Sequence, residues 1–538
     1  MIRGTNQKET TLTGTIANIN NKYVVLNDKR FIEQSEIVNK LLPDDTINYV
    51  LTNTNTIRII SVTKREPQIV LGIIKSINTI NQHIEIHCPG LPKFFSPCIP
   101  FLNTYKQGNA LIIQIDQSST NVLRVYESVQ HRNNDKNMFL ELYKLSASVC
   151  NLYPIYKYNS ISHYTDDHQD LTHLDSFNVD PVGSKDFDDA LSVGEDGRIY
   201  VHIVDANEQI QPSTSVDVNA FLSSFTLYLP EHVENILPKE YAENRLSLVK
   251  NEPRKTITVE FTIDQDTQNI VRYKIYKSTI IIKNRYNYEE FNTIIHKYPM
   301  LVSFHEKWKK NSMNVPHVKM QIDETTGKLS SYTFESNQDL AHKVIETFMI
   351  LTNITISKHF PTTVPQRYHC KSDVEFVKEN FFGNEIIDSI FTIKKYKRAI
   401  YDPTQEGHFG LGVNSYTHFT SPIRRYFDVV NHRLLSGIEY ENLDDVLQHI
   451  NHREKYIDKL VKLYENLKIL SYLESDLTKV WKGYVINKTP SGLVVLLDGL
   501  LYEIFIFDKN YTYVVKDTVN VKIISIKWVT LDVKAIIV

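Results

Sequence analysis

A short β-rich unit recurs three times along the chain, and this repeat constrains the fold more than any other feature. The segment LTGTIANIN at residues 12–20 is echoed by LGIIKSIN at residues 71–78, and WKGYVIN at residues 481–487 repeats the pattern near the other end. Each segment has a glycine near its start and opens a run in which apolar and polar residues alternate, as they do along a β-strand. Short strands with a bending glycine are typical of small Greek-key barrels of the OB type.

Barrels of this type bind oligonucleotides across one face, with basic side chains and aromatic stacking. In the last unit, Trp481, Lys482 and Tyr484 combine both kinds of side chain and are candidate contacts to nucleic acid. Packing in the barrel core is the alternative, because aromatic residues in strands more often serve as core.

The composition is globular, and the chain is long enough for several domains. Of its 538 residues, 42% are hydrophobic and 23% are charged, which argues against a disordered or fibrous protein. The formal net charge is −3, so any nucleic-acid surface must be local. The four cysteines form no CxxC pair or disulfide framework, which favours a reducing compartment. No signal peptide or membrane-spanning stretch is readable, so we expect a cytoplasmic or other intracellular protein without membrane association.

Between the β-rich units, helical and strand patterns alternate. Apolar residues recur at three- and four-residue spacing in segments that we predict as helices: 138–153, 340–359, 422–435 and 443–477. Strands are predicted at residues 198–205 and 255–261. The fold class is therefore multidomain, with three small all-β barrels flanking one large α+β domain. The predicted bounds are 1–66 and 67–130 for two N-terminal barrels, 131–478 for the α+β domain and 479–538 for the C-terminal barrel, with a linker at 132–136.

The sharpest local feature is a carboxylate cluster, made of Asp180, Asp186, Asp188 and Asp189. Unit charges about 4 Å apart repel by roughly 4 kcal/mol at an effective dielectric of 20, so such a loop needs cations if it folds inward. Aspartate oxygens suit Mg²⁺ or Mn²⁺. A solvated acidic loop is the alternative. A calcium loop is disfavoured, because Leu191 stands where the EF-hand pattern requires glycine. The cluster runs into apolar residues 190–193, which places it at the mouth of a buried strand.

A second distinctive stretch, HFGLGVNSYTHFTSPIRRYFDVVNHR, occupies residues 408–433. Thr420 or Ser421 can serve as N-cap, with Pro422 at the first position of the predicted helix. A helix N-terminus attracts anions. The segment therefore predicts a phosphate-binding site.

Cationic side chains at the start of this predicted helix strengthen that interpretation. Arg424 and Arg425 can bind phosphate oxygens bidentately. Four-residue spacing places Arg424, Asp428 and His432 on one helix face and Arg425 on another. An ion pair between Asp428 and an arginine of its own helix is the structural alternative. Cleavage of a phosphodiester needs carboxylates that hold metal and cations that neutralise charge at phosphorus, so the two segments together predict hydrolysis of RNA or DNA.

At these two segments the chain resembles the ribonuclease II family, the RNB-domain exoribonucleases that include the catalytic subunit of the eukaryotic exosome. Residues 180–190 are similar to the family's acidic signature, and YTHFTSPIRRY at 416–426 is similar to its second signature, closest to the eukaryotic version. The resemblance extends to the tripeptide at 228–230, to Leu246-Ser-Leu248 and to the helical segment at 346–353. The flanking units match the family's order of two cold-shock domains, an RNB catalytic domain and a C-terminal RNA-binding barrel.

This resemblance implies a Mg²⁺-dependent, hydrolytic and processive 3′→5′ exoribonuclease that degrades single-stranded RNA to nucleoside 5′-monophosphates, with Mn²⁺ as a substitute ion. By motif position the four aspartates would hold metal, with Asp188 and Arg424 catalytic. The implied RNA-binding residues are Tyr228, which would stack on the 3′-terminal base, Arg424, Arg425, His432, Arg433 and Glu465, the last by a loose alignment to a helical glutamate.

The resemblance leaves two alternative functions open. One is a catalytically inactive RNB-fold protein that binds RNA, and the other is a nuclease that acts on DNA. No endonuclease domain is expected ahead of the barrels. A protein partner, such as an RNA helicase or a degradation complex, is not identified by the sequence.

Overall fold

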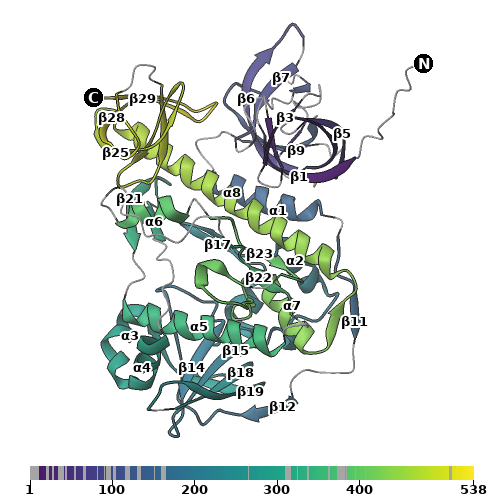
Figure 1. Ribbon diagram of the computed structural model, residues 1–538, viewed down its shortest axis with the longest axis vertical. Helices are drawn as coiled ribbons and strands as arrows, with labels where there is room; N and C mark the ends of the chain where they lie inside the picture. The colour runs from purple at the N-terminus through teal and green to yellow at the C-terminus, as the bar shows by residue number, and fades with distance from the viewer. Residues whose placement is uncertain are drawn as a thin grey trace, which may run out of the picture. The chain divides into compact units, whose positions relative to one another are not determined.

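The computed structural model forms two compact units, Met1–Cys150 together with Lys459–Val538, and Asn151–Asp458 (Figure 1). The second unit is shorter at both ends than the predicted domain 131–478. The structure describes residues 11–19, 23–26, 29–33, 41–42, 45–53, 56–64, 68–81, 83–89, 91, 98–100, 105–115, 122–129, 135–150, 152–158, 165–264, 266–308, 317–323, 325–335, 339–360, 364–371, 382, 385–393, 396–405, 407–507 and 512–538.

The first unit begins with a closed five-stranded barrel. Its strands pair in the order β1-β2-β3-β5-β4, and the parallel pairing of β3 with β5 closes it. Ile16, Val24 and Ile47 are among its fully buried core residues. The strand bounds are β1 (Leu12–Ile19), β2 (Tyr23–Leu26), β3 (Lys29–Glu33), β4 (Thr46–Asn53) and β5 (Thr56–Lys64).

The other two repeats form five-stranded sheets with the same relative strand order as the barrel. Their orders are β10-β9-β6-β7-β8 and β27-β26-β25-β28-β29. In each, the first strand lies between the second and the fourth, as in the closed barrel. The bounds are β6 (Gln68–Asn78), β7 (His83–His87), β8 (Cys98–Pro100), β9 (Ala110–Ile115), β10 (Val122–Val129), β25 (Val480–Thr489), β26 (Gly492–Leu497), β27 (Glu503–Phe507), β28 (Thr518–Lys527) and β29 (Asp532–Ile537).

The recurring glycine permits close packing between neighbouring strands. A Cβ atom on Gly72 would lie 2.6 Å from the Ile86 side chain, and one on Gly483 would lie 2.5 Å from the Val495 side chain. Both distances are too short for a real contact, so a larger residue would push the partner strand away. This approach requires glycine in the second and third repeats, whereas a Cβ atom on Gly14 in the first repeat would lie 3.2 Å from the Tyr49 ring.

Two predicted nucleic-acid contacts in the last sheet are core residues. Trp481 is 7% exposed and Tyr484 is 4% exposed, so neither ring offers a face for base stacking. Lys482 remains exposed and lies 3.9 Å from Asp498. Core packing, the alternative for the two aromatic residues, is what the structure shows.

Two helices of the first unit pack together. The rings of Phe139 and Tyr464, on helices α1 (Asp135–Ser148) and α8 (Leu443–Ser475), meet edge to face at 5.0 Å. Helix α8 starts in the second unit, which ends at Asp458. The predicted linker 132–136 lies mostly outside the described residues. No helix in the described part of the chain is both long and apolar enough to cross a membrane.

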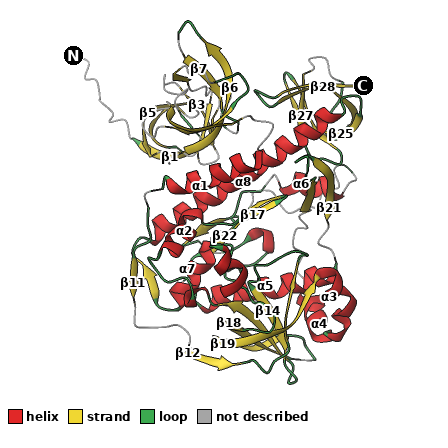
Figure 2. Cartoon of the chain, turned by 180° about the vertical axis from the view of Figure 1, so that it is seen from behind, coloured by secondary structure: helices red, strands yellow, loops and turns green. Residues whose placement is uncertain are grey.

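A sheet of the second unit carries the acidic motif (Figure 2). Its strands run in the order β12-β19-β13-β14-β15-β18. A further pairing of β19 with β18 closes a ring of β19, β13, β14, β15 and β18, and β12 pairs with β19 outside this ring. Strand β19 is 18 residues long, so one part pairs antiparallel with β18 and another pairs parallel with β13. The bounds are β12 (Thr165–Asp170), β13 (Ser176–Asp180), β14 (Asp189–Val193), β15 (Arg198–Val204), β18 (Pro253–Ile263) and β19 (Ile270–Asn287).

The second unit also contains helices and pairs of short strands. The helices are α2 (Ser215–Ser223), α3 (Tyr288–Ile294), α4 (Pro299–Trp308), α5 (Leu340–His359), α6 (Glu385–Ile393) and α7 (Tyr426–Leu435), with short helical turns η2 (Ala206–Glu208), η3 (Tyr241–Arg245), η4 (Ile295–Lys297) and η5 (Phe409–Leu411). The short paired strands are β11 (Tyr156–Tyr158) with β24 (Ile438–Tyr440), β16 (Leu227–Leu229) with β17 (His232–Glu234), β20 (His317–Ile322) with β21 (Leu329–Glu335), and β22 (Gln366–Tyr368) with β23 (Ile400–Asp402).

The hydrophobic core of this unit joins the sheet to its helices. Phe177 on β13 stacks on Phe291 of α3 at 5.3 Å, and Phe304 of α4 stacks on Phe348 of α5 at 5.4 Å. All four rings are almost completely buried. The core therefore fixes the sheet and α5, the elements that border the acidic motif.

Candidate active site

Two neighbouring strands present the acidic motif. Asp180 is the last residue of β13 and Asp189 is the first of β14, and these strands pair antiparallel. The loop between them carries Asp186 and Asp188 and returns the chain to the same edge of the sheet. The sheet thus places both ends of the motif at one edge, as predicted from the apolar residues that follow it.

Side chains from outside the motif hold this loop in place. The Ser247 hydroxyl accepts a hydrogen bond from the backbone N–H of Phe187 at 3.0 Å and donates to the backbone oxygen of Lys185 at 2.7 Å. The guanidinium of Arg285 donates to the backbone oxygen of Ser184 at 2.7 Å and lies 4.0 Å from the centre of the Phe187 ring. The loop is consequently braced rather than free in solvent.

The four aspartates line one cavity of about 600 Å³. Arg424, Arg425, Ser421 and Tyr228 also line it. The remaining lining residues are Val179, Pro181, Ser184, Tyr288, His342, Ile345, Glu346, Met349, Ile350, Asn353, Leu411, Tyr416 and Thr420. The structure therefore brings the acidic motif and the arginine motif to the same place.

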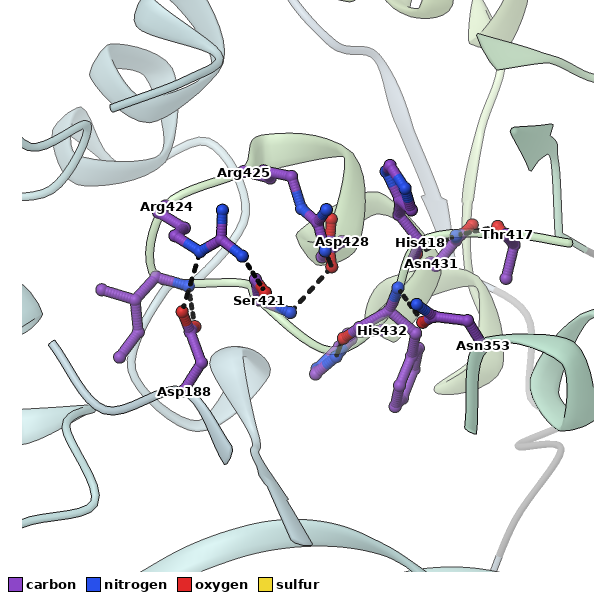
Figure 3. A network of polar contacts seen from close by, with 12 residues as sticks. Asp188, Asn353, Thr417, His418, Ser421, Arg424, Arg425, Asp428, Asn431 and His432 are labelled. Carbon is purple, nitrogen blue, oxygen red and sulfur yellow. Dashed lines mark hydrogen bonds and ion pairs between the residues drawn. The ribbon is translucent and has the colours of Figure 1, made fainter. Parts of the chain in front are cut away.

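Asp188 and the arginine motif are in direct contact (Figure 3). The backbone N–H of Ile423 donates to Asp188 Oδ1 at 2.7 Å, and Arg424 Nε lies 3.6 Å from Asp188 Oδ2. Arg424 Nη2 donates to the hydroxyl of Ser421 at 2.8 Å. Asp188 is 4% exposed, whereas the side chain of Arg424 is 41% exposed and remains accessible to a ligand.

The helix of the second motif begins later than predicted. Residues 422–424 form a turn and helix α7 starts at Tyr426, because nearby backbone groups bond elsewhere. The N–H of Tyr426 donates to the Ser224 oxygen at 2.8 Å, and the Arg424 oxygen accepts from the N–H of Thr226 at 3.0 Å. These long-range bonds replace the first helical turn, so the prediction of a helix from residue 422 is wrong.

The prediction that Arg424 shares a helix face with Asp428 and His432 is also wrong. Arg424 precedes the helix, and it is Arg425 that pairs with Asp428, at 2.9 Å. The same Asp428 oxygen accepts from the backbone N–H of Ser421 at 2.8 Å. Asp428 is completely buried, so its charge is used to fix Arg425 and the Ser421 turn. The structural alternative for Asp428, an ion pair with an arginine of its own helix, is confirmed with the N-cap residue of α7, Arg425, as the partner.

Burial raises the pKa values of three carboxylates in the cavity. Burial, with the charge of Asp189, raises the pKa of Asp180 to about 8. Burial also raises the pKa of Asp189 to about 6 and that of Asp188 well above its usual range, while the nearby Arg424 acts in the opposite direction on all three. Further positive charge in the cavity would favour the ionised form of these carboxylates near neutral pH, because it offsets their desolvation and repulsion.

The oxygen donors fit a hard divalent cation. Asp180 Oδ2 is buried and has no hydrogen-bond partner among the described residues. The four aspartates do not supply three oxygens that all lie within 4.8 Å of one another. The four carboxylates line the cavity without converging on a single ion position. Mg²⁺ commonly takes one or two carboxylates and completes its shell with waters and substrate phosphate, so the open arrangement leaves room for those ligands.

Aromatic side chains border the same cavity. Tyr228, on strand β16, is 45% exposed and offers its ring to a ligand. Tyr288, at the start of α3, stacks on His342 of α5 with ring centres 3.5 Å apart. His342 Nδ1 lies 2.6 Å from a carboxylate oxygen of Asp339, which fixes its ring.

Sequence reasoning missed the roles of Tyr288 and His342. Asn287 and Glu290 form a capping box, a signal that predicts the start of α3 but not its position at the cavity. Burial raises the pKa of both Tyr228 and Tyr288 above the usual value, so both hydroxyls stay protonated and can donate hydrogen bonds. Glu346 also lines the cavity, although the sequence indicated only its helix.

His432 and Arg433 cannot contact RNA in this structure, because both are completely buried. The His432 ring stacks on Phe419 at 4.1 Å, and burial lowers its pKa to about 4, so the ring is neutral. Arg433 pairs with buried Asp217 at 2.8 Å and donates to the backbone oxygen of Ile210 at 2.9 Å. The prediction of RNA-binding roles is therefore wrong for these two residues, which hold the fold together.

Glu465 lies outside the unit that contains this cavity. It is on the part of helix α8 that belongs to the first unit, where its carboxylate lies 3.8 Å from Lys462. It is not among the residues that line the cavity. Its role at the site stays a prediction.

Comparisons with known proteins find one matching family model, related sequences and similar folds. The RNB domain family matches residues 168–441. Ribonuclease R of Aquifex aeolicus is 29% identical over 406 residues, which cover 62% of this chain and 57% of that protein. The structure of Mycoplasma genitalium RNase R in complex with ribose-methylated single-stranded RNA has a TM-score of 0.76 at 19% identity, covering 98% of this chain and 100% of that chain. Yeast Ssd1, a pseudonuclease, has a TM-score of 0.71 at 15% identity, covering 92% and 79%.

Proposed function

The chain belongs to the RNB-domain family, and we propose that it is a divalent-metal-dependent 3′→5′ exoribonuclease that hydrolyses single-stranded RNA to nucleoside 5′-monophosphates. One observation carries the proposal: Arg424 lies 3.6 Å from Asp188 in a cavity lined by all four aspartates of the acidic motif. Carboxylates for metal and a cation for the scissile phosphate are the two requirements of metal-assisted phosphodiester hydrolysis.

Asp180, Asp186, Asp188 and Asp189 would hold Mg²⁺, with Mn²⁺ as a substitute. When bound, the metal supplies activation of water and stabilisation of the leaving oxygen. The unpartnered oxygen of Asp180 and the raised pKa values of the buried aspartates support this assignment, because a cation offsets both costs. The N–H of Ile423 keeps Asp188 in one orientation.

Arg424 would counter the charge that develops on the scissile phosphate. Its exposed guanidinium reaches the cavity, and Ser421 fixes the direction in which it points. Arg425 is neutralised by Asp428 and therefore contributes more to the shape of the turn than to free positive charge. Tyr228 would stack on the terminal base, because its ring is exposed at the cavity.

Single-stranded RNA is the proposed substrate. The RNase R of Mycoplasma genitalium binds such RNA, and its fold covers nearly all of this chain. The three five-stranded segments have the strand order of OB-type barrels, which bind single strands without reading sequence. Processive degradation from the 3′ end is what the resemblance to the ribonuclease II family implies, and the RNB-domain match and the relatives named ribonuclease R support that family assignment.

The second candidate is an RNA-binding protein without catalysis, and the fold likeness to the pseudonuclease Ssd1 favours it. Incubation of 5′-labelled single-stranded RNA with the protein, in Mg²⁺ and in EDTA, separates the two. An enzyme gives short labelled end products only with Mg²⁺, and RNA labelled at its 3′ end releases labelled mononucleotide from the earliest times. RNA that is shifted in a native gel but stays intact with Mg²⁺ would instead establish the binder.

A further inference from the structure

A second group of metal-ligand side chains lies in the same unit as the catalytic cavity. It consists of His168 on strand β12, Asp205 directly after strand β15, and Glu208 in the short helix η2. One ligand atom from each residue lies within 4.8 Å of the other two. None of the three lines the catalytic cavity, so the group is separate from the site described above.

Asp205 is the buried member of the group. It is 1% exposed. Its Oδ1 accepts a hydrogen bond from the backbone N–H of Asn207 at 3.1 Å, as an N-cap, but Oδ2 is buried with no hydrogen-bond partner among the described residues. Lys255 and Lys277 act on this carboxylate through their charges, yet neither donates to Oδ2. A buried carboxylate oxygen without a partner is costly, and a bound cation would remove that cost.

The spacing of His168 and Glu208 also suits a metal ion. His168 Nε2 lies 3.4 Å from Glu208 Oε1. Two ligands on a tetrahedral Zn²⁺, each about 2.1 Å from the ion, are separated by about 3.4 Å. A direct hydrogen bond between these groups would be shorter, mostly 2.7–3.2 Å. The observed distance fits two ligands that share an ion, as well as an ion pair between the two side chains.

We propose that His168, Asp205 and Glu208 form a second metal site that binds a transition-metal ion of the Zn²⁺ type. One imidazole with two carboxylates suits Zn²⁺, whereas an all-oxygen set such as the aspartates of the catalytic cavity suits Mg²⁺. The two sites are thus selective for different ions. A water molecule would complete a tetrahedral shell, because the chain supplies three ligands.

An ion at this site would connect strand β12 to residues that are hydrogen-bonded to the catalytic segments. Strand β12 pairs with β19 in an irregular register between Thr165 and Gln169, and the ion would fix this strand to η2. Asn207, within η2, donates to the backbone oxygen of His432 at 2.9 Å. The N–H of Val204, the residue before Asp205, donates to the backbone oxygen of Asp188 at 2.9 Å. The site is therefore a structural one that braces the acidic loop and helix α7.

Binding of Co²⁺, a spectroscopic substitute for Zn²⁺, tests the proposal on the full chain. The titration is made with Mg²⁺ in large excess, so that the catalytic carboxylates are occupied by Mg²⁺. The wild type and the Asp188→Asn variant are expected to bind about one equivalent of Co²⁺ with the absorption of a four-coordinate site. The His168→Ala and Glu208→Gln variants are expected to bind it at least roughly tenfold more weakly.

Two matched controls and a second readout make the result decisive. His173→Ala and Glu195→Gln remove exposed side chains of the same types elsewhere in the unit and should leave Co²⁺ binding unchanged. Glu208 is exposed, so Glu208→Gln is expected to fold. Zn²⁺ should raise the Tm of the wild type and of the controls but not that of Glu208→Gln. Equal Co²⁺ affinity of the wild type, His168→Ala and Glu208→Gln would overturn the proposal, as would loss of the ion in Asp188→Asn alone.

Discussion

Asp188 and Arg424 face each other across the candidate site, with Arg424 Nε 3.6 Å from Asp188 Oδ2. They come from distant parts of the chain, the loop before β14 and the turn before α7. The N–H of Ile423 bonds the other oxygen of Asp188, so the two segments are fixed to each other. At 3.6 Å the ion pair is looser than a charge-assisted hydrogen bond, which leaves the guanidinium able to bind phosphate.

Replacement of Arg424 by alanine should lower kcat more than it weakens RNA binding. The guanidinium acts on charge that develops only in the transition state, and removal of one such group typically costs on the order of 10²–10³ in kcat. Single-turnover kinetics together with equilibrium RNA binding measure the two effects separately. Arg424→Lys keeps the charge without the bidentate geometry, so its kcat should fall between those of the wild type and Arg424→Ala. An unchanged kcat in Arg424→Ala would remove this residue from the mechanism.

Replacement of Tyr228 by alanine should weaken the binding of single-stranded RNA. Stacking of a base on an aromatic ring contributes about 1–3 kcal/mol, and this ring is exposed at the cavity. Tyr228→Phe keeps the stacking surface and should bind nearly as tightly as the wild type. Tyr158, which is 70% exposed and does not line the cavity, offers the matched control Tyr158→Ala. Equal losses in the two alanine variants would contradict a specific role for Tyr228.

Replacement of Arg433 by methionine should reduce stability rather than RNA affinity. Arg433 and its partner Asp217 are both fully buried, so the variant leaves the buried charge of Asp217 without its ion-pair partner. Breaking a buried pair in this way typically costs about 3–5 kcal/mol. Urea unfolding measures the loss, and RNA binding below the unfolding transition should match the wild type. A stable Arg433→Met variant with weakened RNA binding would restore the role that the sequence motif suggested.

The metal-free protein should lose stability as the pH rises from about 6 to 8. The pKa of Asp189 is raised to about 6 and that of Asp180 to about 8, against an ordinary value of 3.8. In this window the native state therefore retains protons that the unfolded chain has already released, and stability falls with increasing pH.

Addition of Mg²⁺ should oppose this loss, because the ion displaces the same protons. The increase in Tm caused by Mg²⁺ is expected to be larger at pH 8 than at pH 6. Asp180→Asn should reduce that difference, whereas the exposed control Asp175→Asn should not. A Mg²⁺ effect independent of pH would show that these carboxylates do not hold the ion.

Local patterns predicted much of the fold. Helix α5 spans Leu340–His359, as its apolar spacing predicted, and β15 spans Arg198–Val204 within the predicted strand at 198–205. The predicted start of α7 was wrong because the start depends on hydrogen bonds to the backbone oxygen of Ser224 and from the backbone N–H of Thr226, residues about two hundred positions earlier in the sequence. Apolar periodicity is a property of neighbouring residues and does not contain such tertiary bonds.

The sequence predicted only part of the candidate site, because a local motif does not contain tertiary contacts either. A motif gives the order of residues but not their exposure, so Arg424 at the cavity and Arg433 in the core were indistinguishable in the sequence. Tyr288 and His342 escaped notice because they meet only through the packing of α3 and α5. The trio of His168, Asp205 and Glu208 joins two segments whose local sequences carry no metal-binding spacing.

Turnover by the Asp188→Asn variant tests the central claim most directly. The substitution keeps the size of the side chain and removes the charge that faces Arg424 and the metal. With labelled single-stranded RNA and Mg²⁺, the variant should bind RNA nearly as well as the wild type and release no detectable mononucleotide, while Asp175→Asn should retain full activity. Release of mononucleotide by Asp188→Asn at the rate of the wild type would contradict the proposed mechanism.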